Sequence, residues 1–163
     1  MKKLLIIIVI VVAVGVGMQS RMTKVHSQNL SSPPLNSSST VRAELSTAAY
    51  SVMFRAGTER PFSSPLDFET RRGLYVSADT GLPLFRSEDK YDSGTGWPSF
   101  KKPITMDNVI LNEDRSFDSL RIEVVTRDTG AHLGHVFDDG PAPLRKRWCI
   151  NGVALRFIPD AIQ

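Results

Sequence analysis

The sequence predicts a mainly β domain, in which two antiparallel sheets form a sandwich or partial barrel with short N-terminal helices. From residue 74 onward, short apolar runs alternate with turns rich in Gly, Pro and Asp. One of these runs, RIEVVTR at 121–127, has the two-residue periodicity of a half-buried strand. With 163 residues, 41% of them hydrophobic and 23% charged, the chain is long enough to build one core.

The N-terminal segment is predicted to lie outside this domain. Lys2 and Lys3 precede an uncharged apolar run over residues 4–18, and its 15 residues fit a signal peptide but fall short of the roughly 20 that span a bilayer. We therefore predict a signal peptide over 1–18, with a short membrane anchor as the alternative. The remaining chain is then exported, to the periplasm or the extracellular space. Residues 19–40, rich in Ser and Asn, are predicted to form a flexible polar tether.

The predicted domain covers residues 41–160. Its first stretch, 41–55, has apolar side chains on one face of a short helix or two. The turn DTG separates RIEVVTR from AHLGHVF, which predicts a β-hairpin over 121–137. The runs RWCI and VALRFI are expected to close the domain as strands.

The charge of the chain does not favour nucleic-acid binding. Of the net charge of +3, two units come from Lys2 and Lys3 in the predicted signal peptide. Apart from Arg145, Lys146 and Arg147, no cluster of basic side chains with interleaved aromatic residues occurs. We expect no nucleic-acid partner.

Cys149, in the run RWCIN, is the only cysteine of the chain. In an exported domain a single cysteine indicates intermolecular pairing or a reactive thiol, and a buried structural cysteine is the alternative. In an extended strand, Arg147, Cys149 and Asn151 share one face. Trp148 and Ile150 take the other face and are expected in the core. The thiol then lies beside a cation, which favours the thiolate. An Asn-Gly turn signal at 151–152 could end the strand before Asn151.

The run HLGH places two histidines three residues apart, on opposite faces of a regular strand. A bulge at Gly134 would bring His132 and His135 to one side. Three interpretations follow: proton transfer near the thiol, a structural pair, or a metal site that borrows a carboxylate from Asp138 or Asp139.

The loop DSGTGWPSF, at 92–100, is not a phosphate-binding loop, because no Gly-Lys-Ser/Thr follows its glycines. Pro98 stiffens the backbone beside Trp97, and the glycines allow a tight turn. Trp97 is predicted either to form a rigid wall for an apolar group or to cap the core.

Residues 42–159 resemble the peptide-methionine (R)-S-oxide reductases, the methionine sulfoxide reductase B family. The resemblance rests on five blocks in the order and spacing of that family: GTERPF (57–62), PLF (83–85), KYDSGTGWPSF (90–100), HLGHVFDDGP (132–141) and RWCINGVALRF (147–157).

The resemblance implies two antiparallel sheets with short N-terminal helices, and thiol-dependent reduction of methionine (R)-sulfoxide in proteins through a sulfenic acid on Cys149. It implies that Trp97 packs against the methyl group of the substrate. The other active-site positions that it implies are His132, His135, Arg147 and Asn151, with Asn151 expected to orient an imidazole or a water. The alternatives are a non-catalytic tethered β-domain that binds oxidised peptides, and a Cys/His hydrolase.

Two departures from the family pattern affect metal binding and recycling. Many members bind zinc through two Cys-x-x-Cys pairs, but the corresponding positions here are Ser77, Thr80, Thr126 and Thr129. No zinc and no other cofactor is expected. Thr95 stands at the place of the usual resolving cysteine, so an external thiol reductant of the thioredoxin type is expected to recycle the protein.

Overall fold

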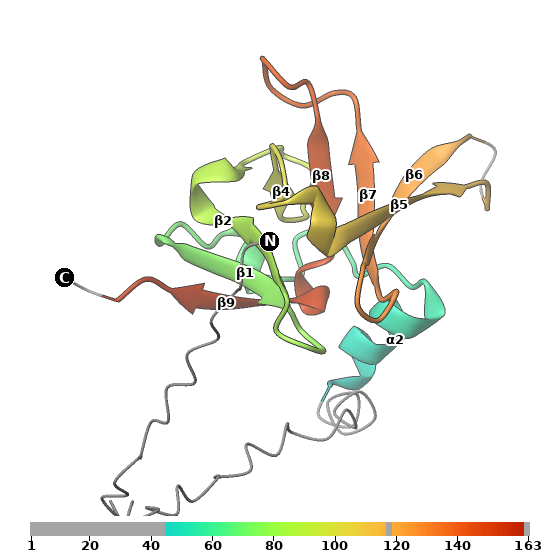
Figure 1. The fold of residues 1–163 in the computed structure, drawn as a ribbon. Coiled ribbons are helices and arrows are strands. Elements are labelled where there is room, and N and C mark those ends of the chain that lie inside the picture. The colour runs from blue at the N-terminus through green and yellow to red at the C-terminus, as the bar shows by residue number, and fades with distance from the viewer. Residues whose placement is uncertain (1–44, 117–118, 162–163) are drawn as a thin grey trace, which may run out of the picture. The chain divides into compact units, whose positions relative to one another are not determined.

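The computed structural model describes residues 45–116 and 119–161, which form two antiparallel sheets and one α-helix (Figure 1). The strand order is β2-β1-β9 in the small sheet and β3-β4-β8-β7-β6-β5 in the large one. The strands are β1 (Gly73–Ser77), β2 (Pro83–Arg86), β3 (Lys90–Tyr91), β4 (Ser99–Phe100), β5 (Val109–Asp114), β6 (Arg121–Thr126), β7 (His132–Phe137), β8 (Arg147–Ile150) and β9 (Leu155–Pro159). The helix is α2 (Thr47–Arg55), and the 3-10 turns are η1 (Pro65–Asp67), η2 (Ser87–Asp89), η3 (Met106–Asn108) and η4 (Gly152–Ala154).

The predicted mainly β fold with two antiparallel sheets is confirmed, and the described strands form no closed barrel. The predicted signal peptide at 1–18 and the tether at 19–40 lie outside the described residues. Within 45–116 and 119–161, no helix is long and apolar enough to cross a bilayer.

Of the short helix or two predicted within 41–55, the described residues contain one, α2. The Ser46 side chain caps its start by accepting from the amide of Ala49 at 3.1 Å, and Ala56 ends it in a left-handed conformation. Its buried face packs beside β7 and η4 (Figure 1). The side chains of that face are Ala49, Val52 and Met53.

Aromatic contacts join the two sheets. The rings of Phe85 on β2 and Phe100 on β4 stack at 4.4 Å, and the ring of Tyr75 on β1 meets Phe100 edge-on at 5.0 Å. Trp148 and Ile150 lie in the same core, as their alternation along β8 predicts. The opposite face of β8 is therefore left for Cys149.

The predicted hairpin over 121–137 is confirmed as β6 and β7, and it contains the predicted bulge. Val124 pairs with Gly134 and Val125 pairs with His132, so Leu133 is the extra residue. A Cβ on Gly134 would lie 2.1 Å from the carbonyl oxygen of Cys149, so only glycine lets β7 approach β8 this closely.

Two turns, one after β1 and one after β6, meet at the buried carboxyl group of Asp79, which is 1% exposed. Asp79 accepts hydrogen bonds from the hydroxyls of Ser77 and Thr129, the latter at 2.6 Å. The hydroxyls of Thr126 and Thr129 lie 2.9 Å apart. We call Ser77, Asp79, Thr126 and Thr129 the turn cluster.

The turn cluster occupies three of the four positions that, by the family resemblance, correspond to zinc-binding cysteines. The fourth, Thr80, accepts a hydrogen bond from the amide of Leu82 at 3.3 Å. Hydroxyl groups do not fit a structural zinc, which takes thiolate or imidazole ligands. Among the described residues, no group of three or more His, Cys, Asp or Glu side chains is arranged to hold a metal ion.

Candidate active site

Strand pairing aligns five polar side chains across the large sheet, and we call them the polar row. They are Tyr91, Ser99, Cys149, His135 and Glu123, on β3, β4, β8, β7 and β6 in that order. Residues directly opposite one another on antiparallel strands point to the same face. The adjacent row of the same sheet is apolar on its central strands and faces the core. The thiol thus lies between Ser99 and His135 on the face away from the core.

Cys149 lies in a pocket of about 130 Å³. The other lining residues are Thr58, Trp97, Arg121, Gly134, His135, Phe137 and Asn151. This volume is well below the several hundred Å³ of sites that hold whole drug-sized ligands, and it suits one amino-acid side chain. Of the predicted site residues, the structure brings Cys149, His135, Trp97 and Asn151 to this pocket and leaves His132 and Arg147 outside its lining.

Three hydroxyl groups form a chain beside the thiol. Ser93 Oγ lies 2.8 Å from both Ser99 Oγ and Thr95 Oγ1, and Thr95 Oγ1 lies 3.9 Å from Cys149 Sγ. Burial raises the pKa of the Cys149 thiol, while Arg147 and the hydroxyls of Thr95 and Ser99 lower it. Arg147 acts in the predicted direction, but burial outweighs it. The resting group is therefore a thiol, which corrects the expectation of a favoured thiolate.

Arg147 is held in place by an acidic and an aromatic side chain. Its guanidinium donates two hydrogen bonds to Asp139, at 2.8 and 2.9 Å, and its Cζ lies 4.3 Å from the ring centroid of Phe137. Hydrogen bonding to Asp139 raises the pKa of Arg147 further. Asp138 pairs with Lys146. Asp138 and Asp139, the two carboxylates considered for a metal site, are thus each paired with a cationic side chain.

His135 is oriented by Asp114 through one ring nitrogen. Its Nε2 lies 2.8 Å from Asp114 Oδ2, and the same oxygen accepts from Arg121 at 2.6 Å. Hydrogen bonds from Ser116 and from these partners hold the pKa of Asp114 well below its usual range. Because Asp114 is anionic, Nε2 carries the proton and Nδ1 is the basic nitrogen of the neutral ring. Burial lowers the pKa of His135, so the resting imidazole is neutral.

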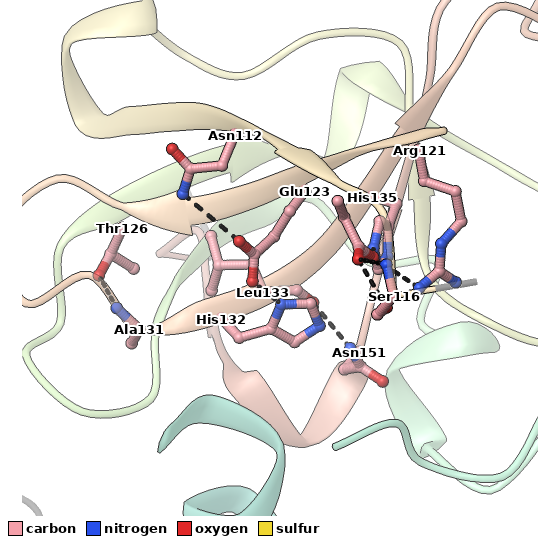
Figure 2. A network of polar contacts seen from close by, with 11 residues as sticks. Asn112, Ser116, Arg121, Glu123, Thr126, Ala131, His132, Leu133, His135 and Asn151 are labelled. Carbon is pink, nitrogen blue, oxygen red and sulfur yellow. Dashed lines mark hydrogen bonds and ion pairs between the residues drawn. The ribbon is translucent and has the colours of Figure 1, made fainter. Parts of the chain in front are cut away.

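His132 has a different partner and a different position. Its Nδ1 lies 2.7 Å from Glu123 Oε1, and Asn112 donates to the other oxygen of Glu123 at 3.4 Å (Figure 2). His132 is 5% exposed, and its ring centroid lies 5.4 Å from that of His135. The bulge thus brings both imidazoles to one side, as predicted, but only His135 lines the pocket of Cys149.

Trp97 forms one wall of the pocket and is held from outside it. The indole N–H donates to the carbonyl of Glu59 at 3.3 Å. Gly96, at φ 88°, precedes it, and a Cβ there would lie 2.8 Å from the amide nitrogen of Phe62. Glycine is needed at this position both for the backbone conformation and for the close contact.

Asn151 is buried, and β8 ends before it, as the Asn-Gly signal allowed. Its Oδ1 accepts from the amide of Glu59 and its Nδ2 donates to the carbonyl of Leu133, both at 3.0 Å. These bonds tie the 57–62 segment to the start of β7. Asn151 therefore binds backbone groups, and the expected hydrogen bond to an imidazole is not present among the contacts of the described residues.

The sequence did not predict Asp114 and Arg121 at this site, and it did not predict Glu59. Its carboxylate accepts from the amides of Gly152 and Val153 at the start of η4, the second at 3.2 Å, and burial raises its pKa. Together with its bonds to Trp97 and Asn151, it links the wall of the pocket to the end of β8. It lies within the GTERPF block, which was the available signal.

Comparisons with known proteins cover the chain segments that form this site. The family model described as the SelR domain matches residues 45–159, a range that includes every lining residue of the pocket. A peptide methionine sulfoxide reductase MsrB of Methanosarcina barkeri (strain Fusaro) is 52% identical over 113 residues, which are 69% of this chain and 80% of that protein. The protein of the same name from Methanosarcina mazei is 49% identical over 119 residues, or 73% and 85%. That of Alteromonas mediterranea is 47% identical over 116 residues, or 71% and 82%.

Proposed function

This chain belongs to the methionine sulfoxide reductase B family, and we propose that it reduces methionine (R)-sulfoxide in proteins to methionine with Cys149 as nucleophile. The observation that carries the proposal is the position of the thiol, between Ser99 and His135, in a pocket walled by Trp97. No resident cofactor is needed for this reaction, because the thiol itself takes up the oxygen.

The pocket accepts the sulfoxide side chain with its methyl group against the indole of Trp97. Contact between a sulfur-bound methyl group and an aromatic ring stabilises binding by roughly 0.3–1.5 kcal/mol. The hydrogen bond from the indole to the Glu59 carbonyl orients this wall of the pocket.

Proton transfer and sulfur attack are coupled through His135. His135 and Cys149 are directly opposite on β7 and β8, so their Cβ atoms are about 4.5–5.5 Å apart. The thiol gives its proton to Nδ1, and the imidazolium passes it to the sulfoxide oxygen, which makes the substrate sulfur electrophilic. The Cys149 thiolate attacks that sulfur and forms an S–S bond. The hydroxyl group then moves with its electron pair to the sulfur of Cys149, the S–S bond breaks with its pair on methionine, and Cys–S–OH remains. No proton or electron is left over.

Two charged groups stabilise the ion pair that this step creates. Asp114 holds the positive imidazolium through Nε2, and Arg147 lies near the developing thiolate. A site with a neutral thiol and a neutral imidazole at rest thus becomes ionic only when substrate is bound.

Recycling uses a thiol from another molecule. The first external thiol condenses with the sulfenic acid, releases water and leaves a mixed disulfide on Cys149; a second thiol reduces that disulfide. The chain has one cysteine, and Thr95 stands where a resolving thiol would lie. A thioredoxin-like protein is the expected reductant.

The domain works without structural zinc in this proposal. The turn cluster joins the two turns through the Asp79 carboxyl group, in the role that zinc has in other members. We also propose that the domain acts outside the cytosol, on the basis of Lys2, Lys3 and the apolar run that follows them.

The test is reduction of the separated (R) and (S) epimers of N-acetyl-methionine sulfoxide with dithiothreitol. Only the (R) epimer is expected to react. Cys149→Ser is expected to abolish turnover and to keep the circular dichroism spectrum of the wild type. Without reductant, the wild type is expected to gain the mass of one oxygen atom and to react with a sulfenic-acid probe.

The matched control uses the two tryptophans. Trp97→Phe is expected to raise KM, because the wall of the pocket recedes, whereas Trp148→Phe in the core is expected to lower stability and leave KM unchanged. Residual turnover by Cys149→Ser, or release of an acyl product in place of methionine, would contradict the proposal. The second outcome would indicate a hydrolase.

A further inference from the structure

A second hollow lies beside the pocket of Cys149, with a volume of about 490 Å³ against about 130 Å³ for that pocket. Among its lining residues are Phe62, Asp67, Phe68, Glu69, Tyr91 and Gly94. We call it the aromatic groove. None of these residues has a part in the reaction derived above.

The aromatic groove adjoins the pocket of Cys149 through two chain segments. The segment 58–62 lines the pocket at Thr58 and the groove at Phe62, and the segment 91–97 lines the groove at Tyr91 and the pocket at Trp97. Tyr91 also belongs to the polar row, two strands from Cys149 on the same face. Two strand spacings are about 10 Å, the length of roughly three residues of extended chain.

Two phenyl rings stand out from the surface at the groove. Phe62 is 58% exposed and Phe68 is 66% exposed, although both line a concave surface. Phe62 has φ 62°, a strained value for a residue with a large side chain, and its amide donates to the carbonyl of Gly96 at 2.7 Å. This bond fixes the backbone of Phe62 against the loop that carries Trp97. Exposed aromatic rings on a fixed backbone are typical of binding surfaces.

The charged side chains around the groove are mostly acidic. Asp67, Glu69 and Asp92 line it together with a single cation, Lys90. Glu69 pairs with Arg71 at 2.6 Å, and Lys90 donates to the backbone carbonyl of Asp67. An acidic side chain on a bound molecule would therefore meet carboxylates, while an apolar one would meet the phenyl rings.

We propose that the aromatic groove binds the polypeptide segment next to the methionine sulfoxide of a protein substrate, favouring apolar and disfavouring acidic side chains within about three residues of it. This inference rests on the proposed function and adds the substrate feature that the pocket of Cys149 is too small to recognise. The two chain segments that line both the groove and that pocket select substrate polypeptide as the occupant of the groove.

The experiment uses the full-length chain as enzyme and dithiothreitol as reductant, and it compares kcat/KM for three substrates. They are N-acetyl-methionine (R)-sulfoxide amide, a heptapeptide with leucines around the central sulfoxide, and its counterpart with glutamates. The wild type is expected to prefer the leucine peptide. Phe62→Ala and Phe68→Ala are each expected to lower kcat/KM for that peptide by about three- to tenfold. Neither is expected to change kcat/KM for N-acetyl-methionine (R)-sulfoxide amide, the blocked amino acid.

Ile158→Ala is the matched control, because Ile158 is 49% exposed on β9 and does not line the groove. It is expected to change none of the three values. The inference would be overturned if the phenylalanine variants lost kcat/KM equally for the blocked amino acid and the leucine peptide, or lost none for the peptide. The same variants are also assayed with a thioredoxin-like protein as reductant. A raised KM for that protein without any effect on peptides would overturn the inference too, and would assign the groove to the reductant. If the wild type reduces none of the three substrates, the proposed function fails instead.

Discussion

The polar row and the turn cluster are two sets of polar side chains on the same scaffold, and they use their hydrogen bonds differently. In the turn cluster, the carboxyl group of Asp79 is enclosed and takes its hydrogen bonds from Ser77 and Thr129 within the cluster. In the polar row, Cys149 opens into a pocket, and His135 is bound at one nitrogen by Asp114 while the other is the basic one.

The difference separates stability from reactivity. A buried polar group with all its partners contributes to the fold and resists change, because removing one partner leaves the others unsatisfied. A partly buried thiol and imidazole with shifted pKa values are held ready for proton transfer. Substitutions that act on Cys149 and His135 in the polar row should therefore change rates, and substitutions in the turn cluster should change stability.

The largest effect is expected for His135→Gln. Loss of the proton-transfer group should lower kcat by about 10²- to 10⁴-fold, with little change in melting temperature. His132→Gln is the matched control, since His132 binds Glu123 and does not line the pocket of Cys149. Steady-state kinetics with N-acetyl-methionine (R)-sulfoxide as substrate measures kcat for both variants. Equal losses would show that the two imidazoles work as one unit.

Asp79→Ala should lower the free energy of unfolding by about 2–4 kcal/mol, because Ser77 and Thr129 lose their acceptor in the interior. Activity per folded molecule should stay the same. Asp128→Ala, at an exposed residue of the same turn, should stay within about 0.5 kcal/mol of the wild type. Urea denaturation measures the change. An unchanged urea midpoint for Asp79→Ala would contradict a structural role for the turn cluster.

The pH profile of the wild type should be broad. The reactive state needs a neutral His135 and a protonated Cys149, so kcat/KM should fall only below the ordinary histidine pKa of 6.5 and only above the ordinary cysteine pKa of 9.0. Asp114 raises the pKa of His135, so Asp114→Asn should move the acid limb to still lower pH. It should also lower kcat about tenfold, because the imidazolium loses its counter-ion. Glu123→Gln, which acts on His132, should leave the acid limb in place.

The smallest effect is expected for Thr95→Val. The Thr95 hydroxyl lowers the pKa of Cys149. Loss of this hydroxyl should therefore raise the pKa of Cys149 and reduce the fraction of thiolate at a given pH. Alkylation by iodoacetamide at pH 8 should slow by about two- to threefold, given a weak hydrogen bond to sulfur. Thr80→Val, at an exposed residue far along the chain from the thiol, should react at the wild-type rate. Faster alkylation of Thr95→Val would contradict the hydroxyl chain.

Local patterns predicted those parts of the site that depend on strand geometry. The alternation along RWCI placed Trp148 in the core and Cys149 opposite it, because successive side chains of a strand point to opposite faces. Gly134 predicted the bulge that brings the two histidines to one side, because a glycine can approach the neighbouring strand without a clash. The resemblance to a known family supplied the chemistry.

The unequal positions of the two histidines were not predictable from HLGH alone. They depend on β5 and β6, which supply Asp114 to His135 and Glu123 to His132. The same holds for Glu59, which contacts Trp97, Asn151 and η4 only after distant segments have met. Pairing between segments far apart in the chain is set by the packing of the whole domain.

The sequence by itself determined the class of fold, the faces of β6 to β8 and the identity of the single thiol, because these follow from periodicity, turn residues and composition. Only the tertiary structure decided which imidazole reaches the thiol, which way the pKa of Cys149 moves and where a substrate chain can lie. The burial of a side chain and the charges near it depend on atoms from many segments of the chain. Those segments come together only in the folded domain.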